Sequence, residues 1–381
     1  MNNKTVTHFT CSSFFGNSET FIYTTIKGIE KYQVQCLAKQ YIHDDLFPFP
    51  DALKKKYRPT YFKYVPWRYQ QSAEDFILRK YMKNVMPTVI HAHFGTSGYR
   101  VVKVAREYSI PLVTQFYGYD MSAQIKLDDW ADRYKFLFQQ GDAFIVEGAF
   151  MKEKLIEAGA KRNSVSVIPI PVCTDKIEFL PRFPVKNRQV TILFCGRFVE
   201  KKGLLDALRA VKKLNDNGIK SIDFQIVGDG RMRPKIEKFI SDHEMEAYVH
   251  LRGFLNYAEY LQIFRAADIF LAPSVTGPDG NTEGGAPTVI LEAQAAGLPI
   301  VATSHADIPN IVARDPESAL LSPEGDWVAL SENLKQLIQN QDCWLKMGEA
   351  GRQFVQDNHD VSMVIPKVED LYLSLQEGIY T

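Results

Sequence analysis

The chain has 381 residues, of which 45% are hydrophobic and 24% charged, as in ordinary folded globular proteins. This length exceeds what one hydrophobic core usually serves, so about two domains are expected. The 45 basic and 45 acidic side chains leave no net charge, which gives no general argument for binding nucleic acid.

The five cysteines are widely spaced and form no CxxC pair, so we expect reduced thiols and no zinc site. The N-terminal residues lack the apolar core of about 7–15 residues that marks a signal peptide. No window approaches the roughly 18 apolar residues that a membrane span requires. These features predict a cytoplasmic protein.

Residues 1–170 alternate between apolar runs typical of strands and amphipathic runs typical of helices. This alternation predicts an N-terminal α/β domain with a parallel, doubly wound sheet. The expected strands are Thr5–Thr10, Gln33–Gln40, Thr88–Phe94, Pro111–Phe116, Ala143–Glu147 and Ser164–Ile168. The expected helices are Glu19–Tyr32, one ending at Tyr108, one ending at Gln140, and Ala149–Ala158.

Residues 171–189 are rich in proline and predict an interdomain linker. The alternation restarts over residues 190–354, and residues 326–377 are expected to be helical. Two Rossmann-like β/α/β domains would leave an interdomain cleft at the carboxyl ends of their sheets, where such folds bind ligands. The expected strands are Val190–Cys195, Phe224–Val227, Val249–Gly253, Asp268–Ser274 and Pro299–Thr303, and the helices are Gly203–Asn217, Pro234–His243, Tyr257–Arg265 and Thr288–Ala296.

The most informative segment runs from Asp268 to His305. It holds a short apolar strand, a glycine-rich stretch, and a helix that begins near Pro287. Free N–H groups at such a helix N-terminus suit phosphate, whereas the carboxylates of Glu283 and Glu292 suit the hydroxyl groups of a ribose or a sugar. The pattern predicts a sugar-nucleotide site. The alternative is an ordinary α/β unit with a long surface loop and two solvated glutamates.

A second candidate site lies at residues 194–203. Arg197 follows a strand end and Lys202 precedes the helix at Gly203, so both cations would lie beside a helix N-terminus. Arginine offers a fork for phosphate oxygens and lysine a mobile point charge. Lys201 is expected to be exposed. A solvated basic turn is the alternative.

The segment around the two glutamates resembles the paired-glutamate signature of the retaining GT-B glycosyltransferases of family 4, through Glu283, Glu292, Ala293, Ala296, Gly297, Pro299, Ala302 and Thr303. The family usually has one residue fewer between the glutamates, so a one-residue bulge is expected before the helix. Residues 196–203 resemble the diphosphate-binding motif of the family, and Gly228 lies in a turn like the one near its nucleoside. A tight turn between strand and helix is the alternative for Gly228.

Motifs in the first half resemble the branch of this family that assembles bacterial exopolysaccharides of the colanic-acid and amylovoran type. Gly16 lies in a loop similar to one that approaches the donor in these enzymes. Residues 91–94 resemble their HAHF motif; His93 is expected nearer the cleft, and His91 is also consistent with a histidine satisfied within the sheet. Tyr117 stands where relatives usually have the histidine of a His-Gly-Tyr-Asp motif that ends here at Asp120.

The resemblance implies a GT-B fold whose last helix, within residues 355–381, returns to the N-terminal domain. It implies a retaining, metal-independent hexosyltransferase that uses a nucleotide-diphosphate sugar, expected to be a UDP-sugar, and a saccharide or lipid-linked acceptor in cell-surface polysaccharide biosynthesis. The implied donor-binding residues are Gly16, Arg197, Lys202, Gly228, Glu283, Gly284, Gly285, Ala286 and Glu292. Catalytic roles are implied for Glu283, Arg197, Lys202, Tyr117 and Asp120, and acceptor contacts for His93 and Asp120.

A phenol is a poor base at neutral pH, so Tyr117 is expected to position the donor while the departing diphosphate oxygen takes the acceptor proton. No cofactor or metal is expected, because no Asp-x-Asp motif lies in a suitable place. Two other functions stay open. One is another GT-B enzyme, such as a sugar-nucleotide epimerase; the other is a non-catalytic nucleotide-sugar-binding subunit, to which Tyr117 and the longer glutamate spacing point.

Residues 51–85 carry nine Lys and Arg against three acidic residues, interleaved with aromatic side chains. Such a mixture suits an anionic membrane surface or a lipid-linked acceptor, so peripheral association with the inner face of the membrane is a hypothesis. A solvated insertion with a partly packed aromatic core is the alternative.

Overall fold

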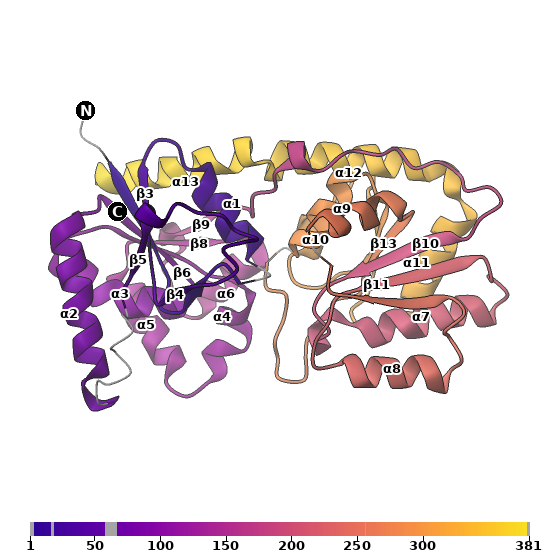
Figure 1. The fold of residues 1–381 in the computed structure, drawn as a ribbon, viewed down its shortest axis with the longest axis horizontal. Coiled ribbons are helices and arrows are strands. Elements are labelled where there is room, and N and C mark those ends of the chain that lie inside the picture. The colour runs from indigo at the N-terminus through magenta and orange to yellow at the C-terminus, as the bar shows by residue number, and fades with distance from the viewer. Residues whose placement is uncertain (1–3, 17–18, 58–66, 256, 286, 379–381) are drawn as a thin grey trace. The chain divides into compact units, whose positions relative to one another are not determined.

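The structure is a computed structural model that describes residues 4–16, 19–57, 67–255, 257–285 and 287–378. The chain forms two compact units, Met1–Pro171 with Val361–Thr381 (unit 1) and Val172–Asp360 (unit 2), and each is built on its own parallel sheet (Figure 1). Both units have the α/β architecture that the alternating pattern predicts. Among the described helices, none is both long and apolar enough to cross a lipid bilayer.

Unit 1 contains a seven-stranded parallel sheet and a separate two-stranded pair. The described strands are β1 (Thr5–Phe9), β2 (Ser13–Phe14), β3 (Gln33–Ala38), β4 (Gln40–Tyr41), β5 (Lys54–Lys56), β6 (Val89–His93), β7 (Leu112–Gln115), β8 (Ala143–Val146) and β9 (Val165–Val167). The large sheet has the order β5-β3-β1-β6-β7-β8-β9, and β2 pairs with β4. Because the order steps outward from β1 in both directions, the sheet is doubly wound.

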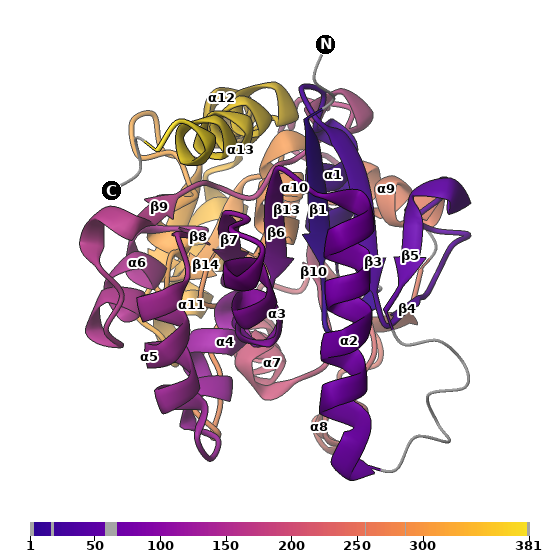
Figure 2. The same ribbon diagram turned by 90° about the vertical axis from the view of Figure 1, so that its left-hand side faces the viewer.

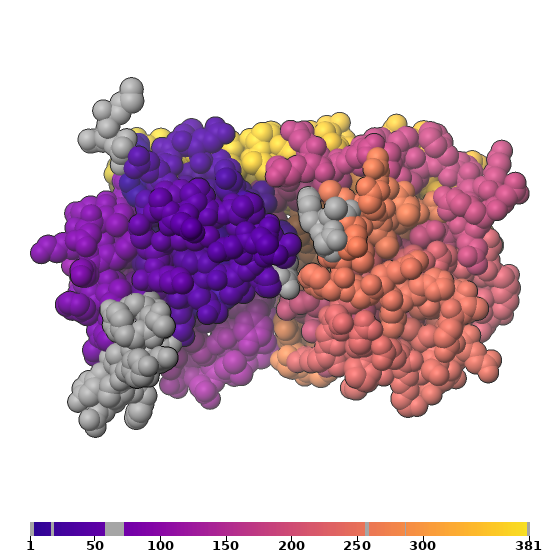
Figure 3. Space-filling view, in the orientation of Figure 1, coloured from indigo at the N-terminus to yellow at the C-terminus, as the bar shows by residue number. Residues whose placement is uncertain are grey.

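The helices of unit 1 are α1 (Thr20–Gly28), α2 (Trp67–Val85), α3 (Gly95–Glu107), α4 (Gly118–Ser122), α5 (Trp130–Gln140), α6 (Ala149–Glu157) and α13 (Val361–Gln376). Successive residues of a strand point to opposite faces of the sheet. One face, with Ile90 and Leu112, packs against α3 and α5. The other, with Val89 and Val113, packs against α13, which comes from the far end of the chain (Figure 2). In Figure 3 the N-terminal residues, in indigo, form much of the visible surface of this unit.

The helix α13 also decides where α1 ends. A Cβ atom on Gly28 would lie 2.6 Å from Cγ1 of Ile365, so the two helices touch at this glycine. Immediately beyond it, the backbone N–H groups of Glu30 and Lys31 donate to Oε1 of Glu369, at 2.8 and 2.7 Å. The helix therefore stops short of its predicted end at residue 32.

Unit 2 is a six-stranded parallel sheet of order β12-β11-β10-β13-β14-β15. Its strands are β10 (Val190–Cys195), β11 (Ile222–Val227), β12 (Val249–Gly253), β13 (Ile269–Ala272), β14 (Ile300–Thr303) and β15 (Ala319–Ser322). Its helices are α7 (Leu204–Asp216), α8 (Arg233–Asp242), α9 (Tyr257–Ala266), α10 (Thr288–Ala295), α11 (Trp327–Gln339) and α12 (Trp344–His359), and a 3₁₀ turn, η6 (Glu200–Lys202), precedes α7.

Further elements differ from the sequence expectations. The strands β2, β4, β5 and β15 and the long helix α2 were not predicted; α2 lies within the basic, aromatic segment 51–85. The helix expected to end at Gln140 is split into α4 and α5, with Asp128 at a φ of 34° between them. A positive φ at a non-glycine residue interrupts a helix, because helical residues have φ near −60°.

Two glycines bring the carboxyl ends of the central strands of unit 2 together. A Cβ atom on Gly203 (φ 64°) would lie 1.8 Å from the carbonyl oxygen of Pro273, which follows β13. A Cβ atom on Gly228 (φ 131°) would lie 1.9 Å from the carbonyl oxygen of Gly196, which follows β10. These contacts, together with the positive φ values, exclude any larger side chain at either position.

Replacing Gly203 by alanine is expected to destabilise unit 2 by about 3 kcal/mol or more, because the methyl group adds a clash with backbone to the strain of a positive φ. Gly218 is the matched control: its φ is 88°, but a Cβ there would meet nothing within 4 Å. Gly218→Ala should therefore cost only the strain, about 1–2 kcal/mol. Chemical denaturation of both variants measures the difference, and equal losses would contradict the close approach.

Candidate active site

The carboxylate of Glu283 is the centre of the candidate site in unit 2. It lies in the glycine loop between β13 and α10, with its side chain 6% exposed. Lys202 approaches Oε1 at 2.8 Å and Lys201 approaches Oε2 at 3.7 Å. Ser274 donates its hydroxyl hydrogen to Oε1 at 2.9 Å. The structure thus joins the two segments that the sequence analysis singled out.

These partners keep Glu283 ionised. Burial would raise the pKa of its carboxyl group, but the positive charges of Lys202 and Lys201 and the hydrogen bonds from Lys202 and Ser274 outweigh burial and hold this pKa well below its usual range. Lys201 was expected to be exposed, and that expectation is wrong. Its side chain is 9% exposed, and its ammonium donates to the carbonyl oxygen of Thr282 at 2.7 Å.

The second predicted cation, Arg197, has a different environment. It directly follows β10 and is exposed, and the residues described by the structure provide its side chain with no hydrogen bond or ion pair that competes for its guanidinium. Lys202 lies on η6 just before α7, with its side chain 15% exposed. The guanidinium of Arg197 and the remaining N–H groups of the Lys202 ammonium can both donate to an anionic ligand.

The other predicted glutamate, Glu292, lies within α10 and behaves differently from Glu283. No cation among the described residues pairs with it; the hydroxyl of Tyr260 donates to its Oε2. Burial raises the pKa of Glu292 to about 7, and the Tyr260 hydrogen bond opposes this only in part. The two glutamates therefore differ in charge near neutral pH. Tyr260 was not singled out from the sequence, because a tyrosine on a helix carries no motif.

The glycines of the loop show why the chain can turn at Glu283. Gly284 has a φ of 76°, and both Gly284 and Gly285 are buried. A left-handed backbone of this kind favours glycine. Ala286, also predicted to contact the donor, lies outside the described residues.

His305 and Glu324 hold the loop and were missed by the sequence analysis. The Glu283 N–H donates to Nε2 of His305 at 3.0 Å, and Nδ1 of His305 lies 2.8 Å from Oε2 of Glu324. His305 follows β14 and Glu324 follows β15. Their position after strand ends was the available signal, but β15 itself had not been predicted.

In unit 1, the predicted residues His93 and Tyr117 belong to a buried polar network. The Tyr117 hydroxyl lies 2.9 Å from Nδ1 of His93, and Nε2 of His93 lies 2.9 Å from Nδ1 of His8. His91 bonds to the Tyr372 hydroxyl and, at 3.1 Å, to Gln115. His91 is therefore a histidine satisfied within the fold, as its alternative interpretation held. His8 was missed because a single histidine in a strand has no pattern around it.

Three histidines of this network, His8, His91 and His93, form a group in the described chain that could hold a metal, since their candidate ligand atoms lie within 4.8 Å of one another. Burial lowers the pKa of each imidazole, so all three are neutral. Both nitrogens of His91 and of His93, however, already have hydrogen-bond partners. A metal ion would have to replace those bonds.

The network also shows how Tyr117 is placed. Its ring is 5% exposed, and its hydroxyl points to His93 within the unit. Burial, with the nearby charges of Glu147, Glu19 and Asp120, raises the pKa of Tyr117 well above its usual value. The phenol therefore keeps its proton at neutral pH.

Asp120, predicted to hold a substrate hydroxyl, is 1% exposed and already engaged. Its Oδ1 accepts from the Gly95 N–H at 3.1 Å and from the Tyr134 hydroxyl at 3.2 Å, and its Oδ2 accepts from the Tyr117 N–H at 2.9 Å. Burial raises the pKa of Asp120 to about 7, against these hydrogen bonds. The arrangement joins the N-termini of α3 and α4, while contact with a substrate stays a prediction.

Two further predicted sites of unit 1 are Gly16 and the basic segment 51–85. The Gly16 N–H donates to Oε2 of Glu19 at 2.8 Å, directly before α1. In residues 51–85, Lys54 pairs with Asp44 and Asp51, and Tyr57 is buried. Residues 58–66 and the side chains of 67–71 lie outside the description, so the membrane hypothesis stays a prediction.

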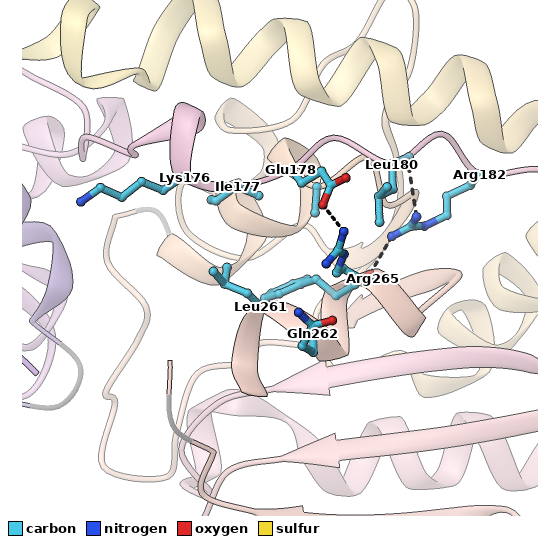
Figure 4. A pocket seen from close by; sticks show the side chains of 10 residues that line it. Lys176, Ile177, Glu178, Leu180, Arg182, Leu261, Gln262 and Arg265 are labelled. Carbon is cyan, nitrogen blue, oxygen red and sulfur yellow. Dashed lines mark hydrogen bonds and ion pairs between the residues drawn. The ribbon is translucent and has the colours of Figure 1, made fainter. Parts of the chain in front are cut away.

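A pocket of about 130 Å³ lies elsewhere in unit 2, between residues 176–182 and α9 (Figure 4). Arg265 faces Glu178 across it, and Arg182 donates to the carbonyl oxygens of Leu180 and Phe264. Its lining residues are separate from Glu283 and its partners.

Comparison with known proteins identifies the family of this chain. The family described as Glycosyltransferase Family 4 matches residues 19–176, and the family described as Glycosyl transferases group 1 matches residues 175–354. The chain belongs to glycosyltransferase family 4. The second match contains the Glu283, Glu292, Arg197 and Lys202 positions.

Curated relatives of this family-4 chain include a putative colanic acid biosynthesis glycosyltransferase of Escherichia coli, 34% identical over 66% of this chain and 61% of the relative. An amylovoran biosynthesis glycosyltransferase of Erwinia amylovora is 32% identical over 65% of this chain and 61% of the relative. The aligned part thus spans about three fifths of these relatives.

Solved structures show that the fold is GT-B. A sucrose-phosphate synthase of Thermosynechococcus elongatus superposes with a TM-score of 0.78 at 16% identity, covering 98% of this chain and 100% of that one. The Anabaena protein HepE, in complex with UDP and glucose, gives 0.78 at 14% identity, covering 97% and 100%.

Replacing Asp120 by asparagine is expected to destabilise unit 1 by about 1–3 kcal/mol, because an amide has one oxygen and cannot accept from both the Gly95 and the Tyr117 N–H groups. Asp45→Asn, at an exposed position, is the control and should change stability by less than about 0.5 kcal/mol. Thermal and denaturant unfolding measure both variants. An Asp120→Asn protein as stable as the wild type would show that these bonds do not hold α3 and α4.

Proposed function

We propose that the protein is a retaining, metal-independent hexosyltransferase that moves a sugar from a nucleotide-diphosphate sugar to a saccharide or lipid-linked acceptor in cell-surface polysaccharide biosynthesis. The observation that carries the proposal is the contact between Lys202 and the buried carboxylate of Glu283 in unit 2, together with the exposed Arg197 just after the carboxyl end of β10. Family membership and relatives whose names refer to colanic acid and amylovoran biosynthesis support it.

The proposed chemistry follows the charges. When the bond between the anomeric carbon and the diphosphate oxygen breaks, negative charge grows on the diphosphate and positive charge on the sugar ring. Arg197 and Lys202 would stabilise the diphosphate, and Glu283, kept ionised, would face the hydroxyls of the sugar. Because Lys202 has three N–H donors, it can serve Glu283 and a phosphate oxygen together.

The acceptor hydroxyl would attack the same face of the sugar, and its proton would pass to the departing diphosphate oxygen. The raised pKa of Tyr117 supports this assignment, because a phenol that holds its proton cannot act as base. UDP is the proposed nucleotide, since several solved neighbours carry it. Peripheral membrane association is the remaining part of the proposal, and co-sedimentation with anionic vesicles at low salt tests it.

Calorimetry with UDP, GDP, ADP and CMP tests the donor site, and proton NMR of the sugar released from a cleaved donor tests retention. UDP should bind the wild type, and cleavage should continue in EDTA. Arg197→Ala should weaken UDP binding roughly 10- to 100-fold, because a charge-assisted hydrogen bond is lost. Lys220→Ala is the control. Lys220 is an exposed cation just before the amino end of β11, whereas the candidate site lies at the carboxyl ends of the strands, so this change should leave UDP affinity unchanged. Binding of none of the four nucleotides would overturn the proposal.

Binding of UDP should also depend on pH through Glu292. Its raised pKa of about 7 means that the carboxyl group is protonated at lower pH, where it cannot accept two hydrogen bonds from ribose hydroxyls. We expect UDP affinity to fall several-fold between pH 8 and about pH 6. Glu292→Gln, which preserves an acceptor for Tyr260, should bind UDP weakly at both pH values. A wild-type affinity that is flat over this range would contradict this role.

A further inference from the structure

The peptide group between Thr282 and Glu283 is held on both of its sides. Its carbonyl oxygen accepts from the Lys201 ammonium at 2.7 Å, and its N–H donates to Nε2 of His305 at 3.0 Å. A peptide group is planar, so two bonds in opposite directions fix its rotation about the chain. The orientation of this group sets where the Glu283 side chain leaves the backbone.

The second bond requires one tautomer of His305. A backbone N–H can only donate, so Nε2 must be the nitrogen that carries a lone pair. The ring hydrogen of the neutral imidazole then lies on Nδ1, which donates to Oε2 of Glu324 at 2.8 Å. His305 is 1% exposed, so water offers this ring no substitute for either partner.

Glu324 ties the other end of the same loop. Its Oε1 accepts from the backbone N–H of Thr276, close to the end of β13, while its Oε2 accepts from His305. One carboxylate therefore joins both ends of the loop 276–283, directly at one end and through His305 at the other. This task needs two acceptor oxygens, which a carboxylate has and an amide lacks.

We propose that His305 and Glu324 are positioning residues of the donor site, which hold the 282–283 peptide group and thereby the carboxylate of Glu283 in the geometry that sugar transfer requires. The proposal rests on the proposed function for its catalytic consequence. The two residues touch no substrate in this scheme. They act through the backbone, whereas Lys202 and Ser274 hold the side chain of Glu283.

Glu324→Gln distinguishes hydrogen bonding by Glu324 from simple packing, because glutamine has nearly the same side-chain shape as glutamate. If the amide oxygen stays on the Thr276 N–H, the amide NH₂ faces Nδ1 of His305 and drives the ring hydrogen to Nε2. Two N–H groups would then face each other at Glu283. We expect kcat for donor cleavage to fall about 10- to 100-fold, since small displacements of a catalytic group have effects of this size. The Kd for UDP should change less than about threefold, since Arg197 and Glu292 are untouched.

The tautomer is read by NMR of protein with ¹⁵N-labelled histidine, in which the eight histidines are few enough to assign by substitution. The wild type should carry its His305 hydrogen on Nδ1 and Glu324→Gln on Nε2. Glu332→Gln is the matched control and should alter neither tautomer nor kcat, because Glu332 is exposed on α11 and forms an ion pair with Lys335 on the same helix.

His305→Gln provides a second test, because its side-chain oxygen can still accept from the Glu283 N–H. It should retain several-fold more activity than His305→Ala at similar thermal stability. Equal losses in these two variants, a wild-type hydrogen on Nε2, or unchanged kcat in a folded Glu324→Gln protein would each overturn the proposal. The tautomer is measured without nucleotide. A wild type that binds no nucleotide would therefore refute the proposed function, while the NMR result would still show whether His305 and Glu324 hold the 282–283 peptide group.

Discussion

The buried negative charge of Glu283 is the constraint on which unit 2 depends. Removing a carboxylate from water is costly unless cations and hydrogen bonds replace the lost hydration. The chain supplies these through Lys201 and Lys202 on η6 and through Ser274 after β13. Those segments can reach Glu283 because Gly203 lets η6 and α7 approach the backbone at Pro273 closely. The electrostatics of the site thus require the glycine contacts of the fold.

The two glutamates of the site have opposite environments, and this difference gives them separate chemistry. Glu283 has two cations and is held ionised, whereas Glu292 has a tyrosine and a pKa raised by burial to about 7. A pair of carboxyl groups whose pKa values are pushed apart can perform two tasks near neutral pH. Under the proposed function, Glu283 would face the sugar as a permanent anion, and Glu292 would accept hydrogen bonds from ligand hydroxyl groups with a strength that depends on pH.

Unit 1 places its polar residues inside the fold. His8, His91 and His93 lie on one face of the sheet and are neutral, and Tyr117 and Asp120 are bonded within the same unit. A motif that resembles a catalytic one can therefore also serve the structure: Asp120 joins α3 to α4, and His93 holds the hydroxyl of Tyr117. Substitutions here would change stability as well as activity, so stability has to be measured beside any loss of transfer.

The sequence by itself determined the α/β class, the strands β1, β6, β10 and β13, and the glycine loop and the Arg197–Lys202 segment as two separate candidate sites, because apolar periodicity and glycine positions are local properties. It also pointed to Glu283 and Glu292 as the acidic residues of the site. It did not indicate the buried state of Lys201, the end of α1 at Gly28, or the roles of His305, Glu324 and His8. Each of these depends on partners that are distant in sequence. Lys201 is buried by its contact with the loop near residue 282, and α1 ends at Gly28 because Ile365 packs there. His305 depends on Glu324, which follows β15, a strand whose sequence has no clear pattern. Burial and hydrogen bonding are set by which strand ends meet, and that arrangement comes from the packing of the whole sheet.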